Sequence, residues 1–456
     1  MEFAGHGAAG NLHYVGWLRE NHPETIMKFV PNLDADLEVT TEPGGDTGAV
    51  QVRNTNDINR EWYHTDWVAD RTIAWLDSLG QDDNWFCWMS FPDPHHPWDP
   101  PKSELHRVDW RDLDLPAGYI ADADEREKVL ATKPAHWMGW YDGSFVSNYE
   151  APANWVPNTL TADQVREINA MVHIENELID EGIGRIVNLL RAKGWYDDVD
   201  IVFTTDHGEF QGDFGLLFKG PYHVDGLLRL PLIWRPAPSA NIAPAVVTEP
   251  VSLVSLAATF LDVAGVPQPE WAEAPRLPQS ESEAKGSGRD STITEWDSAL
   301  FGVDVHVRTV VTSKWLYTRY APGYAHDGTE GELYDLENDP LQRVNLFGDA
   351  GYQAIARDLQ ERIDAHEQRD IERAAHEIGH RQQPAFARRR PDFAHAVERG
   401  GERDHRPGRQ AHAEIAAHRR RVPDLEGGDE RVAARADERG GGALLEIGRA
   451  SCRERV

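Results

Sequence analysis

The chain has 456 residues, enough for two or three domains and a sizeable hydrophobic core. Its 46 lysines and arginines stand against 77 aspartates and glutamates, a formal net charge of −31. This balance excludes a general nucleic-acid binder, which needs a basic face. The sequence contains no run of about 18 apolar residues, so it predicts no membrane-spanning helix. Its two distant cysteines, Cys87 and Cys452, predict neither a disulfide framework nor a cysteine-rich zinc site.

The first predicted elements lead to a loop that carries two histidines. Residues 1–60 predict irregular structure, and residues 62–79 predict an amphipathic helix. The apolar run at 85–91 predicts a buried strand. It is followed by Pro-Asp-Pro-His-His-Pro-Trp-Asp-Pro-Pro, whose prolines keep the backbone extended and stiff. Such a loop can fix His95 and His96 in space; the alternative is that the prolines only end the strand and both histidines are solvated.

A long helix and a second strand come next. Residues 102–160 are rich in loops and aromatic side chains, which is typical of a substrate-facing insertion or a surface wrap. Thr161 and Gln164 fit a capping box, and apolar residues at helical spacing predict a long helix that ends at Gly194. This helix leads into the apolar run at 201–203, which predicts another buried strand. Two strands separated by a helix indicate a parallel sheet.

The most informative stretch follows this second strand. Asp206 and His207 come directly after it, and ligands of open α/β sheets bind at the carboxyl ends of strands. A carboxylate beside an imidazole suits a divalent metal ion. Glycines at 208, 212, 215 and 220 allow tight turns, and Lys219 supplies a mobile cation that can meet an anionic substrate.

The C-terminal third predicts a different architecture. A short strand at 230–234 and an apolar helix over 251–264 complete a first domain, residues 1–265. Residues 266–290 are rich in Pro, Glu and Ser and predict a linker or mobile loop. A C-terminal antiparallel subdomain is predicted over 291–366, because strands follow one another there at hairpin spacing, before one last helix that ends near His366.

The last 86 residues differ in composition and lack the periodic patterns of the rest of the chain. Residues 371–456 contain 18 arginines, no lysine and 15 acidic residues, and neither a helical nor a strand period persists. Such a segment cannot bury enough apolar surface to offset its ordering entropy, so residues 367–456 predict a disordered tail. Residues 446–456 resemble translated sequencing adapter, and we interpret the tail as the product of a shifted reading frame.

Five segments, in order, resemble the sulfatase family of the alkaline phosphatase superfamily, which includes arylsulfatases, choline sulfatases and phosphonate monoester hydrolases. They are Trp-Phe-Cys-Trp-Met-Ser-Phe-Pro-Asp-Pro-His-His-Pro-Trp at 85–98, Val-Phe-Thr-Thr-Asp-His-Gly-Glu at 202–209, Lys-Gly-Pro-Tyr-His-Val-Asp-Gly-Leu-Leu-Arg-Leu-Pro-Leu-Ile at 219–233, Val-Ser-Leu-Val-Ser-Leu-Ala-Ala-Thr-Phe-Leu at 251–261 and Glu-Leu-Tyr-Asp-Leu-Glu-Asn-Asp-Pro at 332–340. The resemblance spans roughly residues 1–365. It implies an α/β fold with a mostly parallel sheet sandwiched by helices and a smaller C-terminal antiparallel sheet.

The resemblance also implies roles for individual residues. Asp206 and His207 correspond to the second pair of ligands of one divalent metal ion, Ca, Mn or Mg. Lys219 corresponds to the lysine that neutralises a sulfate or leaving-group oxygen. His95 corresponds to the histidine that stabilises or protonates the leaving oxygen, with His96 as the alternative if the register slips by one residue. His96 and His223 are further candidates for substrate binding.

The sequence departs from the family pattern in one respect. The family opens with a strand that ends in paired aspartates, followed by a Cys/Ser-x-Pro-Ser-Arg motif whose first residue becomes the formylglycine nucleophile. Neither is present, since Cys87 precedes Trp-Met-Ser and Cys452 precedes Arg-Glu-Arg-Val. We therefore expect the chain to begin well inside the family pattern, without the first strand, half of the metal site and the nucleophile, and to be inactive as a hydrolase.

Three functions remain open at this point. The first is metal-dependent hydrolysis of a small-molecule sulfate ester. The second is hydrolysis of a phosphonate monoester or phosphodiester, because these substrates are tetrahedral oxyanions too, and the Asp-His pair slightly favours the phosphonate-hydrolase or choline-sulfatase branch. The third is a non-catalytic protein that binds an anion or a partner on the same fold. The sequence predicts no nucleic-acid or membrane partner and no particular oligomeric state.

Overall fold

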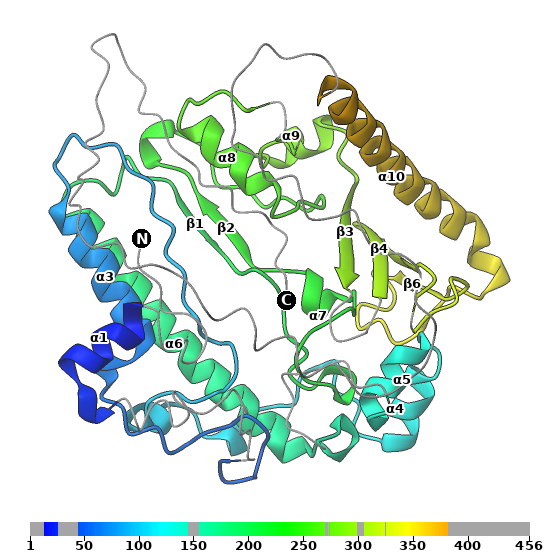
Figure 1. The fold of residues 1–456 in the computed structure, drawn as a ribbon, viewed down its shortest axis with the longest axis horizontal. Coiled ribbons are helices and arrows are strands. Elements are labelled where there is room, and N and C mark those ends of the chain that lie inside the picture. Colours follow the sequence, from blue (N-terminus) through cyan, green and yellow to red (C-terminus); the bar gives the residue numbers. More distant parts are fainter. Residues whose placement is uncertain are drawn as a thin grey trace, which may run out of the picture. The chain divides into compact units, whose positions relative to one another are not determined.

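The computed structural model describes residues 13–25, 44–144, 155–269, 272, 274–298, 305–323 and 325–381. The chain divides into two units, residues 1–369 and 370–456, and both sheets and the candidate site lie in the first (Figure 1). The helices are α1 His13–Asn21, α3 His64–Ser78, α4 Ala123–Leu130, α5 Ala135–Asp142, α6 Ala162–Ala192, α7 Asp225–Leu228, α8 Ser255–Val263, α9 Glu281–Gly286 and α10 Gln353–Arg381. The strands are β1 Ile201–Thr204, β2 Leu232–Arg235, β3 Ser291–Ser298, β4 Val305–Thr312, β5 Trp315–Tyr320 and β6 Gly331–Asp335.

The two sheets differ from the predicted sheet in one respect. An α/β architecture with a C-terminal antiparallel sheet is confirmed, with the strand order β3-β4-β5-β6 in that sheet. The predicted parallel pairing is not found among the described strands, because β1 pairs with β2 in antiparallel register. The chain reverses direction between them through α7, so the two strands need no crossover helix.

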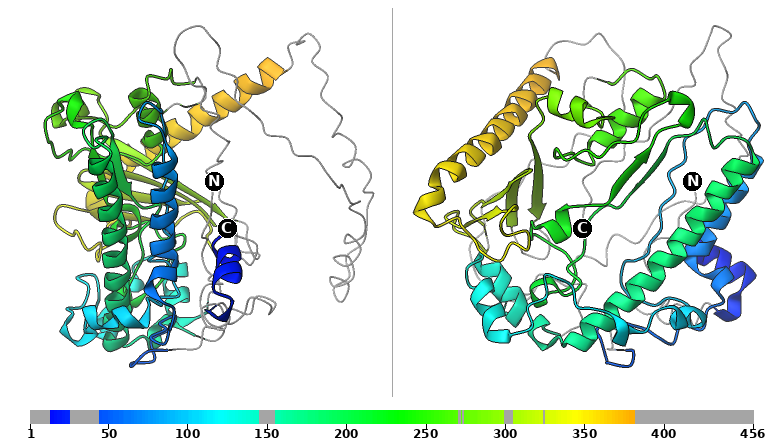
Figure 2. Two further views of the ribbon diagram at one scale, coloured as in Figure 1. Left: turned by 90° about the vertical axis from the view of Figure 1, so that its left-hand side faces the viewer. Right: turned by 180° about the vertical axis from the view of Figure 1, so that it is seen from behind.

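Two long helices support β1. The predicted capping box is present at the start of α6, where the Thr161 hydroxyl accepts from the Gln164 backbone N–H and the Gln164 side chain accepts from the Thr161 N–H. The buried stripe of α6 follows the helical period, and α3 lies alongside it (Figures 1 and 2). Both helices agree with the sequence prediction. No helix in the described part of the chain has the length and apolar character needed to cross a bilayer.

The segment 85–91 is extended but belongs to no sheet, so the prediction of a buried strand was wrong. No described residue forms a backbone hydrogen bond with it, and a strand requires a neighbour that pairs with its peptide groups. Its side chains still alternate: Trp85 packs under α6, whereas Phe86 and Trp88 are exposed. Phe203 and Ile233, which are paired in register, are exposed on β1 and β2.

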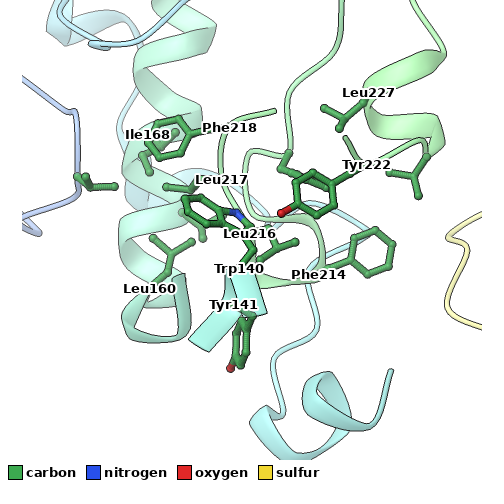
Figure 3. Packing of buried hydrophobic residues seen from close by; sticks show 14 of the residues in the cluster. Trp140, Tyr141, Leu160, Ile168, Phe214, Leu216, Leu217, Phe218, Tyr222 and Leu227 are labelled. Atoms are coloured by element: carbon green, nitrogen blue, oxygen red, sulfur yellow. The ribbon is translucent and has the colours of Figure 1, made fainter. Parts of the chain in front are cut away.

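Other expectations are corrected where the chain forms helices. Residues 1–60 include α1, residues 266–290 include α9, and α10 continues past His366 because its sequence remains rich in strong helix formers. Residues 102–160 contain α4 and α5 rather than a surface wrap, and the aromatic side chains of α5 lie in the main hydrophobic core (Figure 3). The predicted tail lies outside the described residues beyond Arg381.

The C-terminal sheet packs on α10. Val310, Tyr317 and Leu333 share a buried cluster with residues of the helix, and Tyr317 Oη donates to Gln360 Oε1 at 2.8 Å. The opposite face of the sheet contains a buried carboxylate, Glu332, which accepts from Tyr320 Oη at 2.5 Å. The sheet therefore has an apolar face toward its own helix and a polar buried face.

Candidate functional site

Asp206 and His207 lie just beyond the carboxyl end of β1, where the sequence predicted them. The Asp206 Oδ1 atom accepts from the His207 backbone N–H at 3.0 Å and from the Thr205 hydroxyl at 3.2 Å. The two side chains face each other, with His207 Nε2 at 3.6 Å from Asp206 Oδ2, and the Asp206 side chain is 74% exposed. A carboxylate and an imidazole are thus presented together to solvent at a strand end.

The hydrogen bond of the His207 ring fixes its tautomer. His207 Nδ1 lies 2.9 Å from the Gly208 carbonyl oxygen, which can only accept, so Nδ1 carries the proton. The lone pair of Nε2 then points toward the side of Asp206, and a backbone carbonyl on the other ring nitrogen is the usual support for a metal-binding histidine. These two side chains fit one half of a divalent metal site. Among the described residues, no third His, Cys, Asp or Glu joins them in a ligand cluster.

Gly208 has no room for a side chain. A Cβ atom at this position would overlap the Gly226 carbonyl oxygen, because the chain passes directly beneath α7. The Gly208 N–H also donates to the Leu227 carbonyl at 3.0 Å. The close contact with α7 fixes the backbone position of Gly208, and with it the position of Asp206 and His207 just after the strand.

We expect Gly208→Ala to lower the free energy of unfolding by about 2 kcal/mol, because backbone must move to relieve the overlap. Gly184→Ala is the control, since nothing lies within 4 Å of its Cβ position in the middle of α6. That variant should be more stable than the wild type by about 0.5–1 kcal/mol. Urea unfolding of both variants measures the difference; equal effects would contradict the close contact with α7.

Lys219 is placed by the core residues that precede it. Leu216, Leu217 and Phe218 are fully buried (Figure 3). Phe218 stacks on Trp98 with ring centres 6.0 Å apart. The turn before them reverses through Phe214, whose φ of 56° is left-handed. The backbone that leads to Lys219 is therefore fixed by the core, and the long side chain of Lys219 extends from it.

Lys219 meets His95, although the two residues are 124 positions apart in the chain. The Lys219 Nζ atom lies 3.0 Å from His95 Nε2, and His95 Nδ1 lies 2.5 Å from the His96 carbonyl oxygen. Since an ammonium group only donates and a carbonyl only accepts, His95 is the neutral Nδ1–H tautomer and its Nε2 accepts from Lys219. The contact joins a proton donor to a base.

The other two candidate histidines, His96 and His223, are buried. The His96 ring stacks on the His95 ring with centres 4.1 Å apart and packs edge-on against Phe218 at 4.7 Å. The Nδ1 atom of His223 lies 2.7 Å from the Thr309 hydroxyl of β4. Burial lowers the pKa of His223 to about 4. The hydrogen bond of His223 thus joins the Lys219 segment to the C-terminal sheet.

Sequence reasoning missed a group of buried carboxyls behind the His95 loop: Asp93, Asp99 and Glu175. Burial, and then the mutual repulsion of these groups, holds the pKa of Asp99 and of Glu175 well above the usual range. Glu175 Oε1 accepts from the Asp99 backbone N–H at 3.0 Å. The only available signal was the spacing of Asp93 and Asp99 around the two histidines, which a solvated proline-rich loop would show equally well.

Comparisons with known proteins show which family this chain resembles. A sulfatase family model matches residues 43–266, and a model of the C-terminal region of N-sulphoglucosamine sulphohydrolase matches residues 212–369. An uncharacterized sulfatase of Escherichia coli is 27% identical over 293 residues, which are 63% of this chain and 52% of that protein. A choline-sulfatase of Rhizobium meliloti is 28% identical over 363 residues, 74% of this chain and 64% of that protein. The chain thus spans between about half and two thirds of these relatives.

Solved structures give the same fold. A phosphonate monoester hydrolase of Agrobacterium radiobacter superposes with a TM-score of 0.61 at 22% identity, over 78% of this chain and 69% of that one. A second phosphonate monoester hydrolase, from Silicibacter pomeroyi, gives a TM-score of 0.60 at 23% identity, over 77% and 69%. At this identity the likeness concerns the fold alone.

Proposed function

Because this chain belongs to the sulfatase family, we propose that it carries part of the site of a metal-assisted sulfuric-ester hydrolase. Asp206 and His207 would hold one divalent metal ion, Ca, Mn or Mg. When bound, such an ion lowers the pKa of the nucleophile and neutralises charge on the substrate oxygens. The substrate is a small-molecule sulfate ester, and the remaining steps belong to Lys219 and His95.

The observation that carries this proposal is the 3.0 Å contact between Lys219 Nζ and His95 Nε2. Lys219 binds an oxygen of the sulfate group, because an ammonium group forms a strong charge-assisted hydrogen bond with an oxyanion. When Lys219 turns to that oxygen, the Nε2 atom of His95 takes up a proton from solvent and becomes the proton donor of the site. In a protein that also carries the nucleophile, the nucleophile would form its bond to sulfur as the bond between sulfur and the ester oxygen breaks, and His95 would give its Nε2 proton to the leaving oxygen and return to the neutral imidazole.

The nucleophile is the part of this site that the 456 residues do not supply. They contain no Cys-x-Pro-Ser-Arg or Ser-x-Pro-Ser-Arg sequence from which a formylglycine could be made. We therefore propose that the chain by itself binds a sulfate ester without cleaving it. A protein that carries the whole family pattern would add the formylglycine and the opposing aspartates.

A phosphonate monoester is the second candidate substrate. The Asp206-His207 pair slightly favours the phosphonate-hydrolase or choline-sulfatase branch, and a phosphonate monoester presents the same tetrahedral oxyanion to Lys219. The same contacts would serve either ester, and relative affinity therefore decides between them.

Calorimetric titration with 4-nitrophenyl sulfate and with 4-nitrophenyl phenylphosphonate, each with Mn²⁺, tests the proposal. We expect Lys219→Ala to weaken binding of the preferred ester about 10-fold to 100-fold, the value of a hydrogen bond to a charged group. Lys128→Ala, an exposed lysine on α4, should leave the affinity unchanged. Equal affinity of the wild type and Lys219→Ala would refute the site. Release of 4-nitrophenol above that of Asp206→Ala would show that the chain cleaves the ester by itself.

A further inference from the structure

Asp93 is a buried carboxylate two residues before His95. It lies at the N-terminal end of α3, where Tyr63 Oη donates to its Oδ1 at 3.1 Å and the Thr65 hydroxyl donates to its Oδ2. His64 Nε2 lies 3.3 Å from Oδ1. The side chains of three consecutive residues at the start of one helix thus converge on a single carboxylate.

This arrangement offsets part of the cost of burying the Asp93 carboxyl, whose pKa remains raised. Burial raises the pKa of the Asp93 carboxyl, and the His64 ring with the Thr65 and Tyr63 hydroxyls lowers it again. The positive end of the α3 dipole favours an anion at the same place. A buried carboxylate with this many partners stays in place, because each partner that it leaves is left unsatisfied.

The rest of the loop is held by separate contacts. The Trp98 backbone N–H donates to the Gln51 carbonyl at 2.8 Å, and the Asp99 N–H donates to Glu175 at 3.0 Å. These anchors lie after His95, whereas Asp93 lies before it. The stretch that carries His95 is therefore fixed at both ends, and Asp93 is the side-chain anchor at the upstream end.

We propose that Asp93 is a positioning residue for His95. By joining the loop to the first turn of α3, it sets the place from which His95 Nε2 meets Lys219 Nζ. The inference rests on the proposed role of His95. Thr65→Val is the most specific test of this contact, because it removes one hydrogen-bond donor to Asp93 without changing the volume of the side chain.

Long-range ¹H–¹⁵N spectra of the histidine rings test this directly. The His95 signals are assigned by their loss in His95→Gln, and Lys219→Met gives the Nε2 shift of His95 without its lysine. We expect Asp93→Asn and Thr65→Val to move the Nε2 signal toward its position in Lys219→Met. Thr65→Ser, which keeps the hydroxyl, should restore the wild-type position.

Thr318→Val is the matched control, since Thr318 is an equally buried threonine that is hydrogen-bonded to Thr309 at 2.8 Å in the C-terminal sheet. It should lose stability and leave the His95 signals unchanged. If Thr65→Val also leaves them unchanged, Asp93 only stabilises the fold and the proposal is wrong. If Asp93→Asn does not fold, Thr65→Val and Thr65→Ser decide alone. Titration of the wild type with inorganic sulfate distinguishes the proposed function from the proposed role of Asp93. If sulfate does not bind, the proposed function is refuted. The His95 ring signals would still decide the role of Asp93.

Discussion

Replacing Glu332 by alanine should lower the free energy of unfolding by about 3–5 kcal/mol, because it removes the centre of a buried polar network. Glu332 is fully buried on β6. Its Oε1 accepts from Tyr320 Oη at 2.5 Å and from Trp137 Nε1 at 3.2 Å, and its Oε2 accepts from the Tyr334 hydroxyl. Alanine would leave three buried donors unsatisfied and a cavity between them.

The network also contains a buried cation. Lys133 Nζ donates to Tyr334 Oη at 2.6 Å and lies 4.5 Å from the ring centres of Trp137, Phe214 and Tyr334. Burial lowers the pKa of Lys133 to about 8, although the attraction of Glu332 acts in the opposite direction. Without Glu332 the ammonium would lose that attraction, which adds to the expected loss of stability.

Urea unfolding at pH 7 measures this loss. Glu337→Ala is the matched control, because Glu337 is exposed and its ion pair with Lys314 at 2.7 Å should contribute less than about 1 kcal/mol. Glu332→Gln should fall between the two, since an amide oxygen still accepts from one hydroxyl. A loss for Glu332→Ala no larger than that for Glu337→Ala would contradict the network.

Elements with a strong local signal were predicted from the sequence, and those that depend on tertiary packing were not. The capping box and apolar period of α6 are local, and so is the alternation of β4. Helix α5 has aromatic and small residues on all sides, so it lacks an amphipathic period, and it forms because its side chains fill the main core. Segment 85–91 shows the reverse case: its apolar run predicted extended backbone, but sheet pairing requires a neighbouring strand.

The candidate site, too, could be predicted only in part from the sequence. Asp206 and His207 are adjacent in sequence and follow an apolar run, so their common position could be predicted. The choice between His95 and His96 could not, because adjacent residues in a proline-rich loop carry no local signal of direction. In the structure the Lys219 ammonium lies 3.0 Å from His95, while the His96 ring packs between His95 and Phe218. The assignment of His95, Lys219, Asp206 and His207 to catalysis and metal binding stays a prediction until ligand binding is measured.

Lowering the pH should weaken the contact between His223 and Thr309 and so lower the free energy of unfolding. A single substitution of His223 measures the size of this effect. His223 lies four residues after Lys219, and burial lowers its pKa from 6.5 to about 4, with Arg308 as the next cause. A histidine whose pKa is lower in the folded state takes up its proton more readily when unfolded. Its contribution to stability is therefore complete above about pH 6.5 and declines as the pH falls toward 4, by about 3 kcal/mol.

His223→Asn keeps a polar group near Thr309 and removes the titration. Its stability deficit relative to the wild type should be largest at pH 7 and should shrink by about 3 kcal/mol at pH 4. Asp213→Asn is the control of opposite sign, because burial raises the pKa of Asp213 to about 6. The folded state holds the Asp213 proton more tightly, so this residue's contribution to stability falls as the pH rises from about 4 to 6. Urea unfolding at pH 4, 5.5 and 7 measures all three proteins. A deficit of His223→Asn that does not change with pH would contradict the prediction, because it would show that His223 does not titrate in this window.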